Sequence, residues 1–201
     1  MELLGIFHKK TWMEARGVCE APYIEKGGNA LSARDAATSG GVIACALGRM
    51  RNAAALAEEL GLMREERSLA RIVLAAYARW GEDYIEHVEG PVLTAVLGRD
   101  EDRLILCRDR VGERRVFYTI AGGGVAFADH PDMLLEAGCL RPVVDADGLR
   151  ELFGLGPART PGKTPWRDMR ALEAGCALIA RGENARVRRY FRLEAREHED
   201  D

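Results

Sequence analysis

Little in this sequence points to nucleic acid, a membrane or a metal. Its 29 lysines and arginines do not outweigh its 32 aspartates and glutamates, and the net charge of −3 argues against nucleic-acid binding. No apolar run is long enough to span a bilayer and no signal-peptide pattern begins the chain, so we expect a cytoplasmic protein without membrane contact. The four histidines have no ligand-like spacing with one another or with the cysteines, so we predict no metal site.

Cysteine pairs are also missing. The five cysteines are odd in number, widely spread and include no CxxC pair: Cys19, Cys45, Cys107, Cys139 and Cys176. Four of them lie within apolar stretches, which predicts buried free thiols in a reducing compartment.

The length and composition of the chain indicate one domain. A chain of 201 residues, 47% of them apolar, can bury a sizeable core. A block of like charge occurs at the end, from Glu197 to Asp201. We therefore assign residues 1–193 to a single domain and residues 194–201 to an acidic tail or the start of a linker.

Apolar residues at helical spacing predict amphipathic helices. The stretch from Asn52 to Leu60 is rich in alanine, with Asn52 as its N-cap. Ser68 is expected to cap a second helix, whose inward face is formed by Leu69, Ile72, Val73, Ala76, Tyr77 and Trp80. Asp147 is expected to cap a third helix, whose inward face is formed by Leu149, Leu152 and Phe153.

Short apolar runs predict strands, several of them paired in hairpins. The predicted strands span residues 2–7, 42–47, 92–97, 104–107, 116–120, 125–128, 177–180 and 185–192. His8 to Ser39 shows little periodicity and is predicted to be a loop with at most short elements. Gly40-Gly41 is interpreted as a plain turn, because the aspartate and serine of a pyrophosphate loop do not follow it. Helices packed outside doubly buried strands predict an α+β layered sandwich.

A charged turn between two predicted strands is the most distinctive local motif, Arg108-Asp109-Arg110-Val111-Gly112. Gly112 provides backbone freedom that a Cβ would forbid. The arginines could clamp the turn by pairing with Asp109 and with carbonyl groups. An anion site is the alternative interpretation, although most charged turns are structural.

This motif is part of an ordered series that resembles the N-terminal glutaminase-type domain of the asparagine synthetase family. The series includes residues 76–83, 89–90, 108–112, 117–118, 164–166, 172–175 and 189–191, and it covers most of the chain from Ser68 to Leu193. The resemblance implies the N-terminal-nucleophile hydrolase fold, a four-layer αββα sandwich of two mainly antiparallel sheets, with residues 108–112 on an inner hairpin. It also implies a synthetase domain as partner, in cis or in trans, which would hold ATP and Mg. No cofactor is expected in these 201 residues, and a homodimer is left open.

The site residues implied by this resemblance are altered here. Glu2 stands where the family has its nucleophilic cysteine, and a carboxylate is a far poorer nucleophile toward an amide. The oxyanion-binding Asn-Gly pair corresponds to Leu47 and Gly48, and Leu47 cannot donate a hydrogen bond. Arg49 replaces an acid near the place of the substrate ammonium group. Leu69 replaces the aspartate that binds it.

Three functions fit these residues. We favour a domain that keeps the scaffold but not the glutaminase reaction, and that shapes the substrate site of an ATP-dependent amide-forming ligase. β-Lactam synthetases and lasso-peptide macrolactam synthetases are of this kind. The first alternative is an active glutamine-hydrolysing domain of an asparagine synthetase. The second is a stand-alone binding or regulatory protein, in which Arg49, Arg51 and Arg71 would favour an anion.

Overall fold

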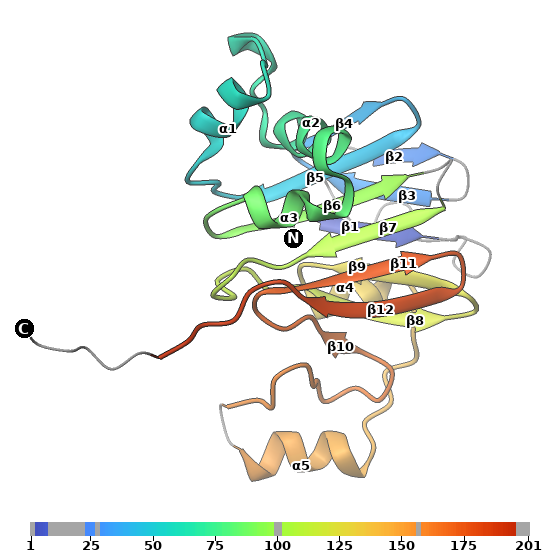
Figure 1. Ribbon diagram of the computed structural model, residues 1–201. Coiled ribbons are helices and arrows are strands. Elements are labelled where there is room, and N and C mark those ends of the chain that lie inside the picture. Colours follow the sequence, from blue (N-terminus) through green and yellow to red (C-terminus); the bar gives the residue numbers. More distant parts are fainter. Residues whose placement is uncertain (1–2, 8–22, 27–28, 99–101, 156–157, 196–201) are drawn as a thin grey trace, which may run out of the picture.

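Two antiparallel sheets of six strands stack face to face within the residues that the computed structural model describes, 3–7, 23–26, 29–98, 102–155 and 158–195 (Figure 1). The first sheet contains, in spatial order, β10 (Arg170–Ala171), β8 (Phe117–Ala121), β9 (Gly124–Ala128), β1 (Leu3–Phe7), β3 (Asn29–Ala33) and β2 (Tyr23–Lys26). The second contains β12 (Asn184–Arg189), β11 (Cys176–Arg181), β7 (Arg103–Cys107), β6 (Val92–Gly98), β5 (Val42–Gly48) and β4 (Ala36–Ser39).

The central strands of the second sheet are buried on both faces because both faces are covered. Along β5, Ile43 and Cys45 pack between the two sheets. The alternate residues Ala44 and Ala46 pack beneath the helices. β6 and β7 alternate in the same way and pair with each other, which confirms the predicted doubly buried hairpin.

Helices cover both outer faces of the sandwich. The second sheet carries α1 (Ala53–Glu59), α2 (Leu69–Trp80), α3 (Tyr84–His87) and the 3-10 turns η2 (Arg64–Glu66) and η3 (Gly81–Asp83). α4 (Pro131–Glu136) packs Met133 and Leu134 against the first sheet. These layers form the four-layer α+β sandwich that the sequence predicted. In the described part of the chain, no helix is long and apolar enough to cross a membrane.

Two of the three predicted helix caps differ from expectation. Ser68 caps α2 as predicted, its hydroxyl accepting the N–H of Arg71 at 3.3 Å. Asn52 precedes α1, but its side chain bonds the backbone of residues 87 and 89 and does not cap the helix. Asp145, and not Asp147, caps α5 (Ala146–Gly154), because its carboxylate accepts the N–H groups of residues 147 and 148.

The predicted inward face of α5 is wrong. Leu149 and Phe153 are 47% and 83% exposed, and the buried residues of the helix are Gly148 and Glu151. Gly148 faces inward because the helix lies close to the backbone of Pro165, where a Cβ on Gly148 would lie 1.9 Å from the carbonyl oxygen. Helical spacing fixed which residues share a face, but this contact decides which face is buried.

The segment from His8 to Ser39 contains more structure than predicted. It includes β2, β3 and β4, and β3 pairs with β1 inside the first sheet. The turn at Gly40 and Gly41 joins β4 to β5 as predicted, with φ of +53° and +89°. Residues 8–22 lie outside the described residues.

Candidate functional site

The glutamine pocket that the sequence resemblance implies would lie where β5 ends. Leu47 stands opposite Leu93 of β6, and its side chain packs against the apolar cluster between the sheets. Gly48 follows with a φ of +122°, and a Cβ there would lie 2.2 Å from the carbonyl oxygen of Pro91. The position that the resemblance assigns to an oxyanion-binding amide therefore carries a hydrocarbon side chain, and the backbone itself requires the glycine beside it.

The chain after Gly48 is held against the segment that leads into β6. The N–H of Arg49 donates to the carbonyl of Pro91 at 3.0 Å, and the N–H of Arg51 donates to the carbonyl of Glu89 at 2.7 Å. The side chains of both arginines are exposed. The backbone of this stretch is thus fixed, while its positive charges lie at the surface.

Leu69 begins α2 and packs on the other face of the second sheet from Leu47. Its side chain is partly buried against the cluster beneath the helices. The next residue, Ala70, donates its N–H to the carboxylate of Asp35 at 3.3 Å. The structure therefore places Leu47 and Leu69 in different apolar clusters, and Glu2 lies outside the described residues.

The turn at residues 108–112 connects the two sheets. β7 ends at Cys107 in the second sheet, whereas β8 begins at Phe117 in the first. The expectation that this motif lies on an inner hairpin is therefore wrong. The physical reason is that β7 already pairs with β6 on one side and with β11 on the other.

A buried carboxylate organises this turn. Asp109 is 3% exposed, and its two oxygens accept the N–H groups of Glu113 and Arg114, each at 2.9 Å. The carbonyl of Asp109 also accepts N–H groups from Gly112 and Gly175, at 3.2 and 2.9 Å. Gly112 has a φ of +75°, which favours glycine. Asp109 thus fixes the turn at residues 108–112 and also holds Gly175, which directly precedes β11, against this turn.

Arg108 joins the same turn to the strand region beyond it. Three of its nitrogens donate to the carbonyls of Arg114, Leu172 and Gly112, at 2.6 to 2.7 Å. Burial lowers the pKa of Arg108 from its ordinary value, and the charge of Asp109 opposes that shift. These contacts make Arg108 a clamp on protein carbonyls, which is not the role of an anion ligand.

The turn also borders the end of β5. The Nε atom of Arg114 lies 3.0 Å from the position that a Cβ on Gly48 would take. Arg110 extends toward α3, where it donates to the carbonyl of Glu86 at 2.9 Å and pairs with Glu89 at 3.6 Å. The motif residues therefore lie beside the strand end to which the resemblance assigns the pocket.

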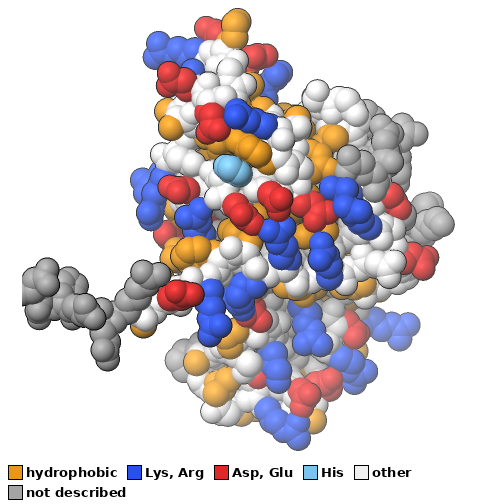
Figure 2. Space-filling view, in the orientation of Figure 1, with side chains coloured by type: hydrophobic (Ala, Val, Ile, Leu, Met, Phe, Trp, Pro, Cys, Tyr) orange, Lys and Arg blue, Asp and Glu red, His pale blue; other side chains and the backbone are white. Residues whose placement is uncertain are grey.

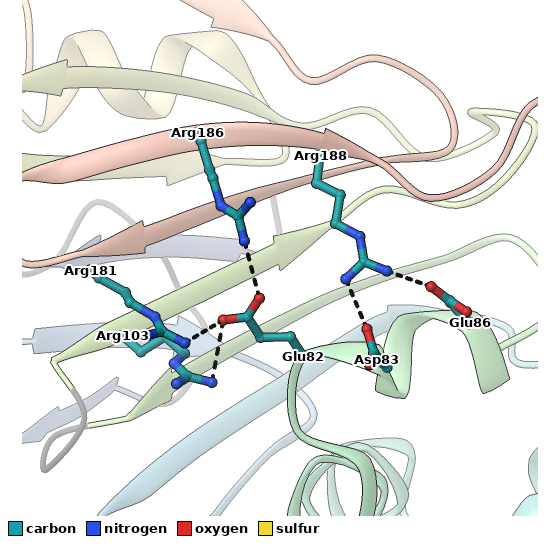
Figure 3. Close-up of polar contacts among 7 residues, drawn as sticks. All are labelled: Glu82, Asp83, Glu86, Arg103, Arg181, Arg186 and Arg188. Carbon is teal, nitrogen blue, oxygen red and sulfur yellow. Dashed lines mark hydrogen bonds and ion pairs between the residues drawn. The ribbon is translucent and has the colours of Figure 1, made fainter.

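Sequence reasoning missed an ion-pair network on the outer face of the second sheet, formed by Glu82, Asp83, Glu86, Arg103, Arg181, Arg186 and Arg188 (Figure 3). Glu82 contacts three of the four arginines at 2.7 to 3.4 Å. Arg188 contacts Asp83 and Glu86 at 2.8 and 2.5 Å. The network holds η3 and α3 against β7, β11 and β12, with carboxylates on the helix side facing arginines on the strand side (Figure 3), and acidic and basic side chains lie side by side on this face of the molecule (Figure 2).

This network lines a pocket of about 600 Å³, which also contacts Ile179, Asn184 and Ala185. The arginines of the network are already paired with carboxylates. We therefore interpret the network as a structural contact between the helices and the second sheet, not as a binding site. One feature of the sequence could have indicated this network. Arg186 and Arg188 lie two residues apart in a predicted strand, so their side chains lie on the same face of the sheet.

Burial makes four of the cysteines poor nucleophiles. It raises the pKa of Cys45, Cys107 and Cys139 to about 12, and it raises that of Cys176 as well. A thiol with such a pKa is protonated at neutral pH, and the thiolate is the reactive form. Cys19 lies outside the described residues. Within the described ranges, no three histidine, cysteine, aspartate or glutamate residues form a group that could hold a metal.

Amidotransferases of known structure share the two stacked sheets with helices outside. The glutamine phosphoribosylpyrophosphate amidotransferase of B. subtilis superimposes with a TM-score of 0.60 at 12% identity, over 94% of this chain and 49% of that chain. A glutamine aminotransferase class-II domain protein of Silicibacter pomeroyi gives 0.54 at 12% identity, over 96% of this chain and 100% of that chain. At these identities the likeness shows a common fold.

The chain belongs to the glutamine amidotransferase domain family, whose model matches residues 37–191. It is also similar to "Asparagine synthetase [glutamine-hydrolyzing] 3" of Bacillus subtilis (strain 168), with 31% identity over 156 residues. That match covers 76% of this chain and 25% of the relative. The chain thus spans about a quarter of the length of the curated relative it matches.

Proposed function

We propose that this chain is a glutaminase-type domain that does not hydrolyse glutamine and serves as a structural domain of an asparagine-synthetase-like amide-forming ligase. The observation that carries the proposal is the apolar packing of Leu47 at the end of β5, where the family resemblance places the oxyanion amide. Family membership supports the scaffold. The altered residues support the loss of the reaction.

Amide hydrolysis needs a nucleophile and a donor to the developing oxyanion. Removing one such donor costs roughly 3 to 4 kcal/mol of transition-state stabilisation in comparable sites. Leu47 offers no donor, and Glu2 at the nucleophile place is a weak nucleophile toward an amide. The four described thiols are buried and protonated, so they do not replace the missing cysteine.

Recognition of glutamine is impaired as well. The ammonium group of an amino-acid substrate needs a carboxylate partner, because charge-assisted hydrogen bonds are the strong ones. By its position in the sequence, Leu69 corresponds to that carboxylate, and its side chain packs beneath the helices, on the opposite face of the second sheet from Leu47. Arg49 places a positive charge where the resemblance has a negative one. Both changes oppose binding of the ammonium group.

The partner in this proposal is an ATP-dependent synthetase domain, in cis or in trans, which would hold ATP and Mg and activate a carboxylate. The amide bond would form when an amine already present in the substrate displaces AMP from the activated carboxylate, so no ammonia would be needed. The relative from Bacillus subtilis supports this partner, because most of its length lies beyond the matched segment. The chain itself would carry no cofactor and would work in the cytoplasm.

Glutamine binding tests the recognition half of this proposal. We expect no saturation-transfer difference signal from millimolar L-glutamine on the purified chain, because no carboxylate stands at the family's ammonium-binding position and Arg49 adds a positive charge near it. The asparagine synthetase 3 of Bacillus subtilis serves as the positive control under the same conditions. A saturable signal on this chain, abolished by competing L-glutamate, would contradict the proposal.

A further inference from the structure

Helix α5 presents its apolar side chains to solvent. Phe153 is 83% exposed, Leu149 is 47% exposed, and Leu155 just after the helix is 45% exposed. Leu149 and Phe153 lie one turn apart on the same side of the helix, and we call these two residues the α5 apolar face. A surface helix normally turns its apolar stripe toward the core, so this helix has the reverse orientation. Apolar side chains grouped on a surface are typical of interaction sites, so this face is a candidate site for a partner.

The polar side of α5 fixes this orientation. Glu151 is 6% exposed, and its carboxylate accepts the N–H and the hydroxyl of Thr160 at 2.9 and 2.8 Å. Those hydrogen bonds hold the pKa of Glu151 below its ordinary value, so it remains a carboxylate at neutral pH. Lys163 adds an ion pair at 3.7 Å. Rolling the helix to bury Phe153 would break all of these contacts.

The start of α5 is anchored in the same way. The carboxylate of Asp145 caps the helix and also pairs with Arg167 at 3.1 Å. Gly148 lies against the backbone of Pro165, where any larger residue would clash. The helix lies beside the stacked sheets, at the bottom of the view in Figure 1. Its apolar face is therefore held outward by contacts at both ends.

Positive charge gathers at the C-terminal end of this helix. Arg159 donates to the carbonyl of Glu151 at 3.4 Å and lines a pocket of about 390 Å³. Arg115 also lines that pocket, together with Arg108 and Lys163, whose side chains already contact protein carbonyls and Glu151. Among the described residues, no aspartate or glutamate lines it. A partner that covers α5 would therefore fit best if it carried carboxylates beside an apolar patch.

We propose that the α5 apolar face docks the synthetase domain of the ligase, with acidic residues of that domain facing Arg115 and Arg159. This inference rests on the proposed function, which supplies the partner. Only 25% of the length of the Bacillus subtilis relative is matched by this chain, so the remainder of such a protein is large enough to cover the helix. Docking at α5 also leaves the ion-pair network on the second sheet undisturbed.

The test uses the synthetase domain encoded with this chain, produced either as its continuation or as a separate protein. The double variant L149S/F153S is compared with the control M63S/I120S, which removes two similarly exposed apolar side chains elsewhere. We expect L149S/F153S to bind the synthetase domain at least tenfold more weakly than the wild-type chain. Isothermal titration calorimetry measures this affinity, either with a separately produced synthetase domain or with the two domains of the continuous protein after the connection between them is cleaved. We expect wild-type affinity for the control and a similar, small decrease in unfolding midpoint for both, because each pair contains one side chain that is only about half exposed, Leu149 at 47% or Ile120 at 49%.

Wild-type affinity of L149S/F153S for the synthetase domain would overturn the docking face while leaving the proposed function intact. A homodimer of the chain that is lost in L149S/F153S, with unchanged synthetase binding, would assign the face to a second copy and would also overturn the inference. Failure of the wild-type chain to bind the synthetase domain would overturn the inference and the proposed partner together. A charge reversal, R115E/R159E, is expected to weaken binding and to make it less sensitive to salt.

Discussion

Replacement of Gly48 by alanine is expected to lower the free energy of unfolding by about 4 kcal/mol. Two effects add at this position. The φ of +122° is a conformation that residues with a Cβ rarely adopt, and the new methyl group would lie 2.2 Å from the carbonyl oxygen of Pro91. The atom in the way belongs to backbone that is itself hydrogen-bonded to Arg49, so it cannot move freely. Urea unfolding followed by circular dichroism measures the change.

Gly40→Ala is the matched control for this variant. Gly40 also has a positive φ, +53°, but no atom lies within 4 Å of the position of an added Cβ. We expect a loss of about 1 kcal/mol there, from backbone strain alone. Equal losses in the two variants would show that the contact with Pro91 does not constrain the end of β5.

Asp109→Ala is expected to destabilise the protein by about 3 kcal/mol, because it leaves the N–H groups of Glu113 and Arg114 without their acceptor in a buried turn. For a chain of this length, that loss lowers the melting temperature by roughly 6 to 12 °C. Differential scanning calorimetry measures it. The effect is large because the same residue holds the connection between the two sheets.

The control for this variant lies in the same turn. Glu113 is exposed, and its backbone N–H, not its side chain, makes the contact with Asp109. Glu113→Ala is therefore expected to change stability by less than about 0.5 kcal/mol. A wild-type melting temperature in Asp109→Ala would show that the buried carboxylate does not support the scaffold.

Local periodicity was sufficient to predict the inner strands and the main helix. The runs at residues 92–97 and 104–107 are apolar at every position except Thr94 because both of their faces are buried, and this pattern identifies a central strand. The inward face of α2 and its cap at Ser68 follow from spacing within one helix. Such features depend on neighbours in sequence, so the sequence alone contains them.

Features set by contacts between distant segments were missed. The orientation of α5 depends on Pro165 and Thr160, which no helical pattern reveals. The connection after β7 crosses between sheets because both edges of β7 are occupied, one of them by β11, some seventy residues later in the chain. The charge network around Glu82 joins residues about a hundred positions apart. Such contacts can be predicted only when the order of the strands in both sheets is known.

The candidate site was found through resemblance, because its own residues give no chemical signal. Leu47 and Leu69 have the composition of ordinary core positions, and the structure packs both in apolar clusters. Only comparison with a family pattern shows which polar groups they replace. Gly48 is different, because its positive φ and close contact with Pro91 give it a structural role that does not depend on catalysis.

Release of glutamate from L-glutamine tests the central claim most directly. The purified chain, alone and together with its synthetase domain, is incubated with glutamine, and glutamate is measured with a coupled dehydrogenase. The asparagine synthetase 3 of Bacillus subtilis is the positive control. We predict a rate no higher than that of buffer in both samples. Saturable glutamate release at a rate comparable to the control would contradict the account and identify the chain as a working glutaminase domain.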